Sequence, residues 1–134
     1  MPKKEFESVY LSAIYELNSP RCIIQIGAPS PSILLKVSLQ ISNWAFITAH
    51  NPGSQIQTLQ QNEQANARLL EKIRELDLQH LDGVAKSQDG HWPEEISYLV
   101  YNLSKEKALQ LARSFGQNAI LFCSLPGNVE LIWV

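Results

Sequence analysis

The apolar and polar positions of the chain alternate between short runs typical of strands and longer stretches with helical spacing. The clearest strand is Trp44–Ala49, which is almost wholly apolar, contains aromatic and β-branched side chains and carries no charge. Asn51–Ser54 should end it, because Pro52 cannot continue a β-ladder and Gly53 tolerates backbone angles that other residues avoid. We therefore predict an interior strand followed by a sharp polar turn.

A long helix should follow from Thr58 to about Asp77. Thr58 and Gln61 form a capping box, in which each side chain covers a backbone N–H that the helix itself leaves unpaired. At roughly 100° per residue, the apolar residues of this helix gather on the face that also carries Asn62 and Asn66, and the opposite face is mostly polar. Two carboxamides therefore point toward the expected core.

The two inward-facing asparagines leave two interpretations open. A buried amide without partners costs about 1–3 kcal/mol, so both side chains should be hydrogen-bonded. In the first interpretation they bind the backbone of the turn Asn51–Ser54, as buried amides usually serve structure. In the second they line a polar pocket between the helix and the end of the strand.

The remaining periodicities predict one α+β domain over residues 1–134, with a mostly antiparallel sheet of about five strands packed against three or four helices. Helices are expected over about Glu5–Leu17 and between Ser104 and Gly116. Further strands are expected at Arg21–Ile26, Leu78–Lys86 (weakly), Ile96–Asn102, Asn118–Leu125 and Val129–Val134, of which the last two form a hairpin.

One segment, Ile33–Ser42, is ambiguous from its pattern alone. Its apolar residues alternate as in a strand, but Ser30 followed by Pro31 is typical of the start of a helix. The periodicity slightly favours the strand.

Composition excludes several classes of protein. The chain is 45% hydrophobic and 18% charged, and its net charge of −2 provides no bulk attraction to nucleic acid or to an anionic membrane. No apolar run is long enough to span a bilayer and no signal peptide is visible, so we expect a cytoplasmic protein. Cys22 and Cys123 lie in apolar runs typical of buried thiols. The wide separation of His50, His80 and His91 predicts no metal site.

The polar loop Ser87–Glu95 concentrates groups that can do chemistry. The pKa of a histidine lies near neutrality, and desolvation can raise the pKa of a glutamate toward that value. His91 and Glu94 are therefore the candidate acid–base pair. The alternative is a solvated loop in which Trp92 fills a gap in the core.

Two further positions offer polar contacts. The turn Asn51–Ser54 leads into a helix start, where free N–H groups suit a phosphate or carboxylate, but its single glycine and lack of lysine distinguish it from a P-loop. A satisfied capping turn is the alternative. Gln117, between a helix stop and a strand, either points inward or makes a cap contact.

Several of these motifs together resemble a known family: the strand Trp44–Ala49 followed by Asn51-Pro52, the helix with Asn62 and Asn66, Asp89-Gly90-x-Trp92-Pro93-Glu94, and Phe115–Ile120. The chain from about Ile24 onward is similar to short bacterial proteins that carry only the label domain of unknown function 3293. The resemblance implies a single-domain bacterial protein and supplies no activity. It also favours a helix over Ser32–Ser42, and His50 stands where the family pattern tends to have an aromatic residue.

These observations lead to two functional hypotheses. The first is a pocket for a small polar ligand, anionic or nucleotide-like, with hydrolysis or transfer as a further step that uses Glu94 or His91. Its predicted binding residues are Thr48, His50, Asn51, Asn62, Asn66, Trp92 and Gln117. The alternative is a non-enzymatic interaction module or homodimer that uses the C-terminal hairpin, with Trp92 and Trp133 at an exposed apolar edge. The sequence does not identify a cofactor and leaves monomer and homodimer open.

Overall fold

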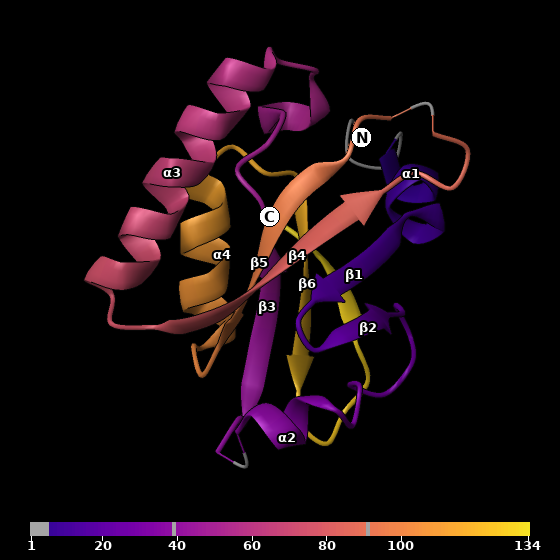
Figure 1. The fold of residues 1–134 in the computed structure, drawn as a ribbon, viewed down its shortest axis with the longest axis vertical. Coiled ribbons are helices and arrows are strands. Elements are labelled where there is room, and N and C mark those ends of the chain that lie inside the picture. Colours follow the sequence, from indigo (N-terminus) through magenta and orange to yellow (C-terminus); the bar gives the residue numbers. More distant parts are fainter. Residues whose placement is uncertain (1–5, 39, 91) are drawn as a thin grey trace.

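The computed structural model describes residues 6–38, 40–90 and 92–134 and folds them into an α+β arrangement around one curled sheet (Figure 1). The strands are β1 (Ile14–Asn18), β2 (Arg21–Ile24), β3 (Asn43–Ile47), β4 (Gln79–Lys86), β5 (Glu95–Tyr101), β6 (Ala119–Ser124) and β7 (Glu130–Trp133). The helices are α1 (Glu7–Ser12), α2 (Leu34–Val37), α3 (Leu59–Glu75) and α4 (Lys105–Ser114), with the 3₁₀ turn η2 (Pro52–Ser54) after β3. No helix in these described ranges is both long and apolar enough to cross a membrane.

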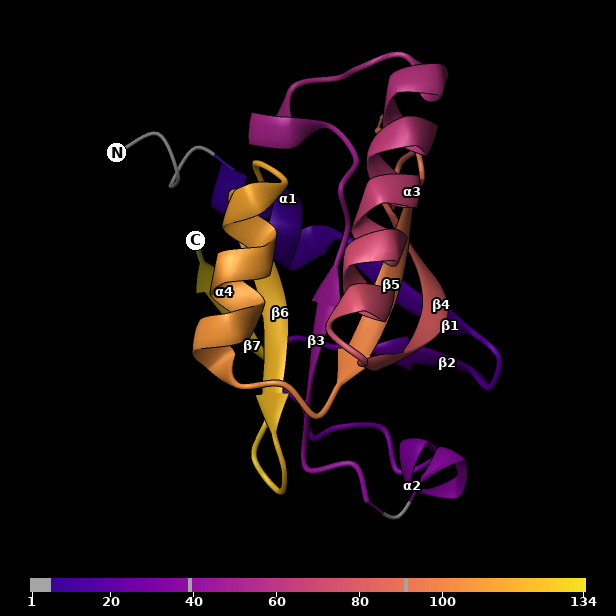
Figure 2. The ribbon, with the colours of Figure 1, turned by 90° about the vertical axis from the view of Figure 1, so that its left-hand side faces the viewer.

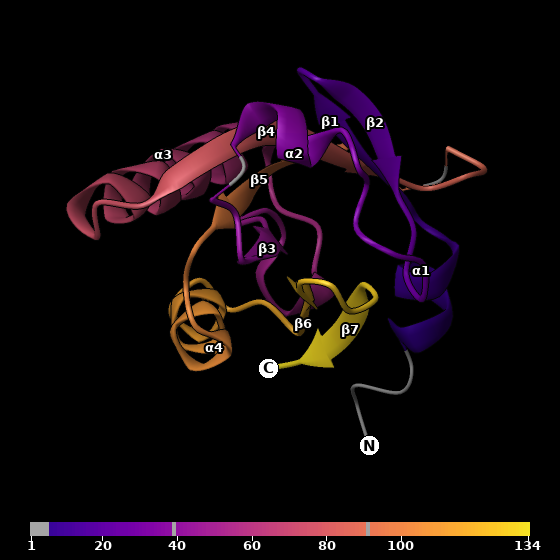
Figure 3. The same cartoon turned by 90° about the horizontal axis from the view of Figure 1, so that it is seen from below.

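The seven strands of the described residues lie in the order β2-β1-β4-β5-β3-β6-β7, and each neighbouring pair is antiparallel. The prediction of a mostly antiparallel sheet is therefore confirmed, with two strands more than the five expected. The chain that follows β2 meets the residue before β7, where Gly27 N–H donates to Val129 O at 2.8 Å and Val129 N–H donates to Ala28 O at 2.8 Å. Helices α1 and α2 lie at opposite ends of the sheet (Figures 1 and 3).

The strand β3 shows how period-two alternation builds two cores. Ala45 and Ile47 face the convex side of the sheet, where α3 and α4 pack over them (Figure 2). Trp44 and Phe46 face the concave side, where they pack with residues of β1, β2 and β6. Because both faces are covered, all four side chains are at most 4% exposed, which explains why this run is continuously apolar.

The local signals around α3 and the C-terminal hairpin are confirmed. Thr58 caps α3 and Gln61 completes the capping box, with bonds of 3.1 Å in both directions. The predicted hairpin partners, β6 and β7, pair antiparallel. In both cases the interacting residues are close in sequence, so the pattern alone contains the information.

The predicted helix Glu5–Leu17 is wrong over its second half. Helix α1 ends at Ser12, and the next residues form β1, which pairs with β2 and β4. Tyr15 and Leu17 are two positions apart and both face the concave core, which a strand permits and a helix does not. Pairing on both sides therefore overrides the helical spacing of the apolar residues.

The ambiguous segment Ile33–Ser42 contains one short helix, α2, over four residues. Leu34 at its start is 1% exposed and belongs to the concave core, whereas Leu35 and Val37 are exposed. The helix expected from the family resemblance is thus present, although it is much shorter than the segment.

Candidate functional site

The turn after β3 is shaped by a hydrogen-bond network centred on Asn51. This residue adopts a left-handed backbone conformation (φ 47°), which costs energy for any residue other than glycine. Its N–H donates to Asn62 Oδ1 at 2.9 Å, and its own Oδ1 accepts from Gln57 N–H at 2.9 Å and from Asn62 Nδ2 at 3.0 Å. The side chain of Asn62 therefore holds the turn in place from α3.

Asn66 has a similar role at the next turn of the helix. Its Oδ1 accepts from Ala49 N–H at 2.9 Å, and its Nδ2 donates to Ile96 O at 2.8 Å. Asn62 and Asn66 are only 6% and 4% exposed. Asn62 therefore binds the turn as the first interpretation predicted, whereas Asn66 binds the backbone of Ala49, just before the turn, and of Ile96 in β5. Neither lines the cavity described next.

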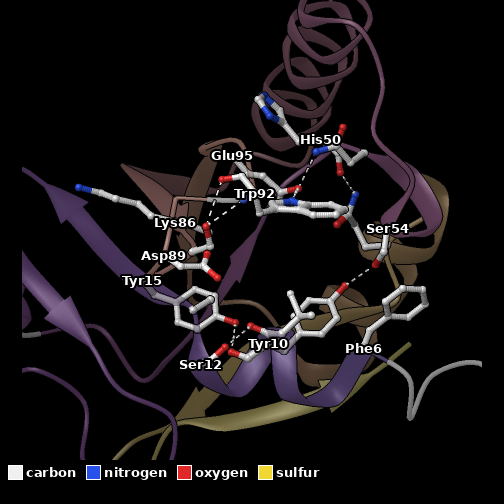
Figure 4. Close-up of a pocket in the computed structure, with 16 residues that line it drawn as sticks. Phe6, Tyr10, Ser12, Tyr15, His50, Ser54, Lys86, Asp89, Trp92 and Glu95 are labelled. Atoms are coloured by element: carbon white, nitrogen blue, oxygen red, sulfur yellow. Dashed lines mark hydrogen bonds between the residues drawn. The ribbon is translucent and has the colours of Figure 1, made fainter.

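A cavity of about 250 Å³ lies between α1, the turn Asn51–Ser54 and the chain that joins β4 to β5 (Figure 4). In the close-up, Trp92 and Glu95 stand on one side, and Tyr10 and Tyr15 face them from the other. Phe6 adds a further aromatic ring to the wall. The cavity thus combines flat apolar walls with the carboxyl groups of Glu95 and Asp89.

Glu95 is the first residue of β5, and strand alternation points it toward the concave side along with Ser97 and Leu99. Its Oε2 accepts from Asn51 Nδ2 at 2.8 Å and from Trp92 Nε1 at 3.0 Å. Burial raises the pKa of the Glu95 carboxyl, and these two hydrogen bonds act in the opposite direction. The raised pKa brings the group closer to the range useful for proton exchange.

Hydroxyl groups attach α1 to the rest of the site. Tyr15 Oη donates to Tyr10 O at 2.6 Å, and Tyr10 Oη lies 3.2 Å from Ser54 Oγ, which also accepts from Asn118 Nδ2 at 2.8 Å. The Tyr10 ring meets Trp133 edge-on, with centroids 5.6 Å apart. Burial raises the pKa of Tyr10 and Tyr15, so both remain neutral phenols at physiological pH.

Gln117 and His50 close the inner end of the cavity wall. Gln117 is 9% exposed and its Nε2 donates to His50 O at 3.0 Å. His50 is 4% exposed, and burial lowers the pKa of its imidazole. His50 Nε2 is fully buried and has no hydrogen-bond partner among the described residues. The ring is therefore neutral at pH 7 and fills space at the turn.

The turn Asn51–Ser54 packs closely against the end of α4 because Gly116 has no side chain. Gly116 has φ 67°, and a Cβ built on it would lie 2.8 Å from Pro52 Cβ. Gly53 N–H donates to Gly116 O at 2.7 Å, which joins the turn to the end of α4. Gly116 thereby lets Asn51 and Gln117 meet at one cavity.

The start of α3 carries the predicted capping box. Gln57 N–H donates to Asn51 Oδ1, Thr58 N–H to Gln61 Oε1, and Gln61 N–H to Thr58 Oγ1. These groups are thus engaged within the protein and do not face the cavity.

Four of the predicted site residues line the cavity: His50, Asn51, Trp92 and Gln117. Thr48, Asn62, Asn66 and Glu94 do not line it. Thr48 Oγ1 donates to Ile96 O, the two asparagines bind the backbone near the turn, and Glu94 is exposed to solvent. His91 lies outside the described residues. Within those residues no cluster of three or more His, Cys, Asp or Glu side chains could hold a metal.

Sequence reasoning missed Glu95 and the aromatic wall of Phe6, Tyr10 and Tyr15. Alternation along β5 places Glu95 on the same face as Ser97 and Leu99, but apolar residues stand on both faces of this strand, so the sequence does not show which face lines the cavity. No signal exists for the tyrosines either, because their place depends on how α1 and β1 fold against the sheet.

Comparison with curated proteins and with solved structures found no match in either set. The model of a family described as "Protein of unknown function (DUF3293)" matches residues 47–120. The matched span runs from the end of β3 into β6 and includes the turn, α3, Trp92, Glu95 and Gln117, whereas α1 and β1 precede it. It covers more than half of the chain, which therefore belongs to the DUF3293 family.

Proposed function

We propose that this protein binds a small planar ligand, of the shape of a nucleobase, in the cavity beside α1. One observation carries the proposal: a partly buried carboxyl group, Glu95, faces an aromatic-walled cavity and is held there through one oxygen by Asn51 and Trp92. The volume of about 250 Å³ is close to the roughly 300 Å³ at the lower end of ligand pockets.

The aromatic side chains support a planar ligand. Rings on opposite sides of a cavity stack on or meet the edge of a flat molecule, and Trp92 and Tyr10 stand in such positions (Figure 4). The apolar walls supply burial, and a carboxyl group supplies orientation. This combination of apolar surface with a few placed polar groups is typical of small-molecule sites.

A purely structural role does not account for the carboxyl group. Burying a carboxylate destabilises the fold, as the raised pKa of Glu95 indicates. The carbonyl oxygen of a glutamine there could accept from both Asn51 Nδ2 and Trp92 Nε1 without burying a charge. An acid at this position is therefore better explained by an interaction with a ligand.

A hydrolytic step, if the bound ligand reacts, would use Glu95 as the acid–base group. Its carboxyl stands in the cavity wall with a raised pKa, whereas Glu94 is exposed outside the cavity. The acid–base role that the sequence suggested for Glu94 thus passes to Glu95.

The test is a thermal-shift screen of nucleobases and nucleosides, followed by titration of the intrinsic tryptophan fluorescence, to which Trp92 in the cavity wall contributes. A ligand at 100 times its dissociation constant should add about 2.7 kcal/mol of stability. Glu95→Ala should abolish the shift, and Glu94→Ala, which alters the adjacent exposed carboxylate, should leave it unchanged. Absence of binding by every planar compound, or equal loss in both variants, would refute the proposal.

A further inference from the structure

The hydrogen-bond donors that line the cavity are largely engaged within the protein. Trp92 Nε1 and Asn51 Nδ2 both donate to Glu95 Oε2, and Tyr15 Oη donates to Tyr10 O. The ammonium group of Lys86 lies 3.1 Å from Glu16 Oε2. A ligand that relies on donors from the protein, such as a phosphate or carboxylate, thus finds few here.

Two acceptor oxygens that line the cavity are, in contrast, not engaged in hydrogen bonds within the described chain. Gln117 directs its Nε2 toward the carbonyl oxygens of His50 (3.0 Å) and Phe115 (3.4 Å), which fixes the orientation of its amide. Within the described chain, neither Gln117 Oε1 nor Glu95 Oε1 has a hydrogen-bond partner. Neither atom is fully buried, because His50 Nε2 is the one described side-chain polar atom that is both buried and unpaired.

The cavity therefore offers two acceptor oxygens from side chains that are otherwise held in place. Gln117 is 9% exposed, and Glu95 is fixed through its other oxygen. The set is complementary to a ligand that brings several N–H donors and a positive charge.

Resting on the proposed function, we propose that the natural ligand of this site is a planar organic cation of the amidine or guanidine type. Its N–H groups would donate to Glu95 Oε1 and Gln117 Oε1, and its delocalised charge would lie between the rings of Trp92 and Tyr10. A hydrogen bond to a carboxylate is roughly twice as strong as a neutral one. A cation over an aromatic face gains further attraction when both are partly removed from water.

Charge balance supports this assignment over the anionic ligand that the sequence suggested. Among the described lining residues, the ammonium group of Lys86 already pairs with Glu16, and no cationic side chain forms an ion pair with Glu95. A positive ligand would compensate the buried carboxylate of Glu95, whereas a negative one would meet a like charge.

Three molecules of nearly the same shape test the inference: benzamidine (cationic), benzamide (neutral) and benzoate (anionic). Binding would be measured by calorimetry with the full chain at neutral pH. Benzamidine should bind at least about tenfold more tightly than benzamide, as expected for a charge-assisted bond. Benzoate should bind more weakly than either.

The matched variants are Glu95→Gln and Glu94→Gln. The first removes the charge but keeps an acceptor for Asn51 and Trp92, so the fold should persist, and an unchanged circular dichroism spectrum would verify this. We expect it to lower benzamidine affinity about tenfold and to leave benzamide affinity within about twofold. Glu94→Gln should leave both affinities unchanged.

The outcomes separate this inference from the proposed function. If the three molecules bind equally, or benzoate binds best, the cationic class is refuted while a planar-ligand site stands. If none of the three binds but a nucleobase does, the cationic class is again refuted. If neither these molecules nor any planar heterocycle binds, both proposals fail.

Discussion

Replacing Asn62 with leucine should destabilise the fold, because this side chain holds the turn that builds the cavity. Asn62 Oδ1 accepts from Asn51 N–H at 2.9 Å, and Asn62 Nδ2 donates to Asn51 Oδ1 at 3.0 Å. Leucine is of similar size but offers neither group. Asn51 Oδ1 would keep its bond from Gln57 N–H, so the loss reduces to one unpaired, buried donor, Asn51 N–H.

The size of the effect follows from that single donor. Leaving a buried N–H unpaired costs about 1–3 kcal/mol. Leucine is a better helix former than asparagine, which returns about 0.4 kcal/mol. The net loss should be about 0.5–2.5 kcal/mol, which for a chain of this length corresponds to a drop in Tm of roughly 2–12 °C.

The assay is urea unfolding monitored by circular dichroism, with the Tm from a thermal scan as a second measurement. Gln64→Leu is the matched control, since it makes a comparable change at an exposed position of the same helix. That control should stay within about 0.5 kcal/mol of the native chain. If Asn62→Leu is as stable as the native chain or more so, the amide does not hold the turn, and the stabilising role of its hydrogen bonds is refuted.

Two further predictions concern Glu95 and Gly116. Burial raises the pKa of Glu95 in the folded chain above its unfolded value, so the folded state binds more protons between the two values and stability falls as pH rises through that window. Glu95→Gln should therefore be more stable than the native chain at neutral pH, and this difference should disappear below about pH 4. Urea titrations at several pH values measure it, and a difference that does not change with pH would contradict the prediction. Gly116→Ala should lose roughly 1–3 kcal/mol, because a Cβ there would lie 2.8 Å from Pro52 Cβ. The control is Gly90→Ala, because Gly90 has the same left-handed backbone but a Cβ there would have no atom within 4 Å. An equal loss in both variants would show that the close approach to Pro52 is not the cause.

Features that depend on neighbours along the chain could be predicted from the amino-acid sequence. The capping box of Thr58 and Gln61 marks the start of α3 because both partners lie within one helical turn. The apolar run at β3 and the C-terminal hairpin are visible for the same reason. The inward placement of Asn62 and Asn66 follows from helical periodicity, and both are buried as predicted.

Which residues share the cavity depends instead on contacts between distant segments. The apolar spacing before Asn18 suits a helix as well as a strand, and only the pairing of β1 with β2 and β4 selects the strand. That choice brings Tyr15 across the cavity from Glu95, which lies far away in the sequence (Figure 4). Whether Glu94 or Glu95 faces inward depends on the register of β5 in the sheet. Because such contacts join distant parts of the chain, no local pattern records them.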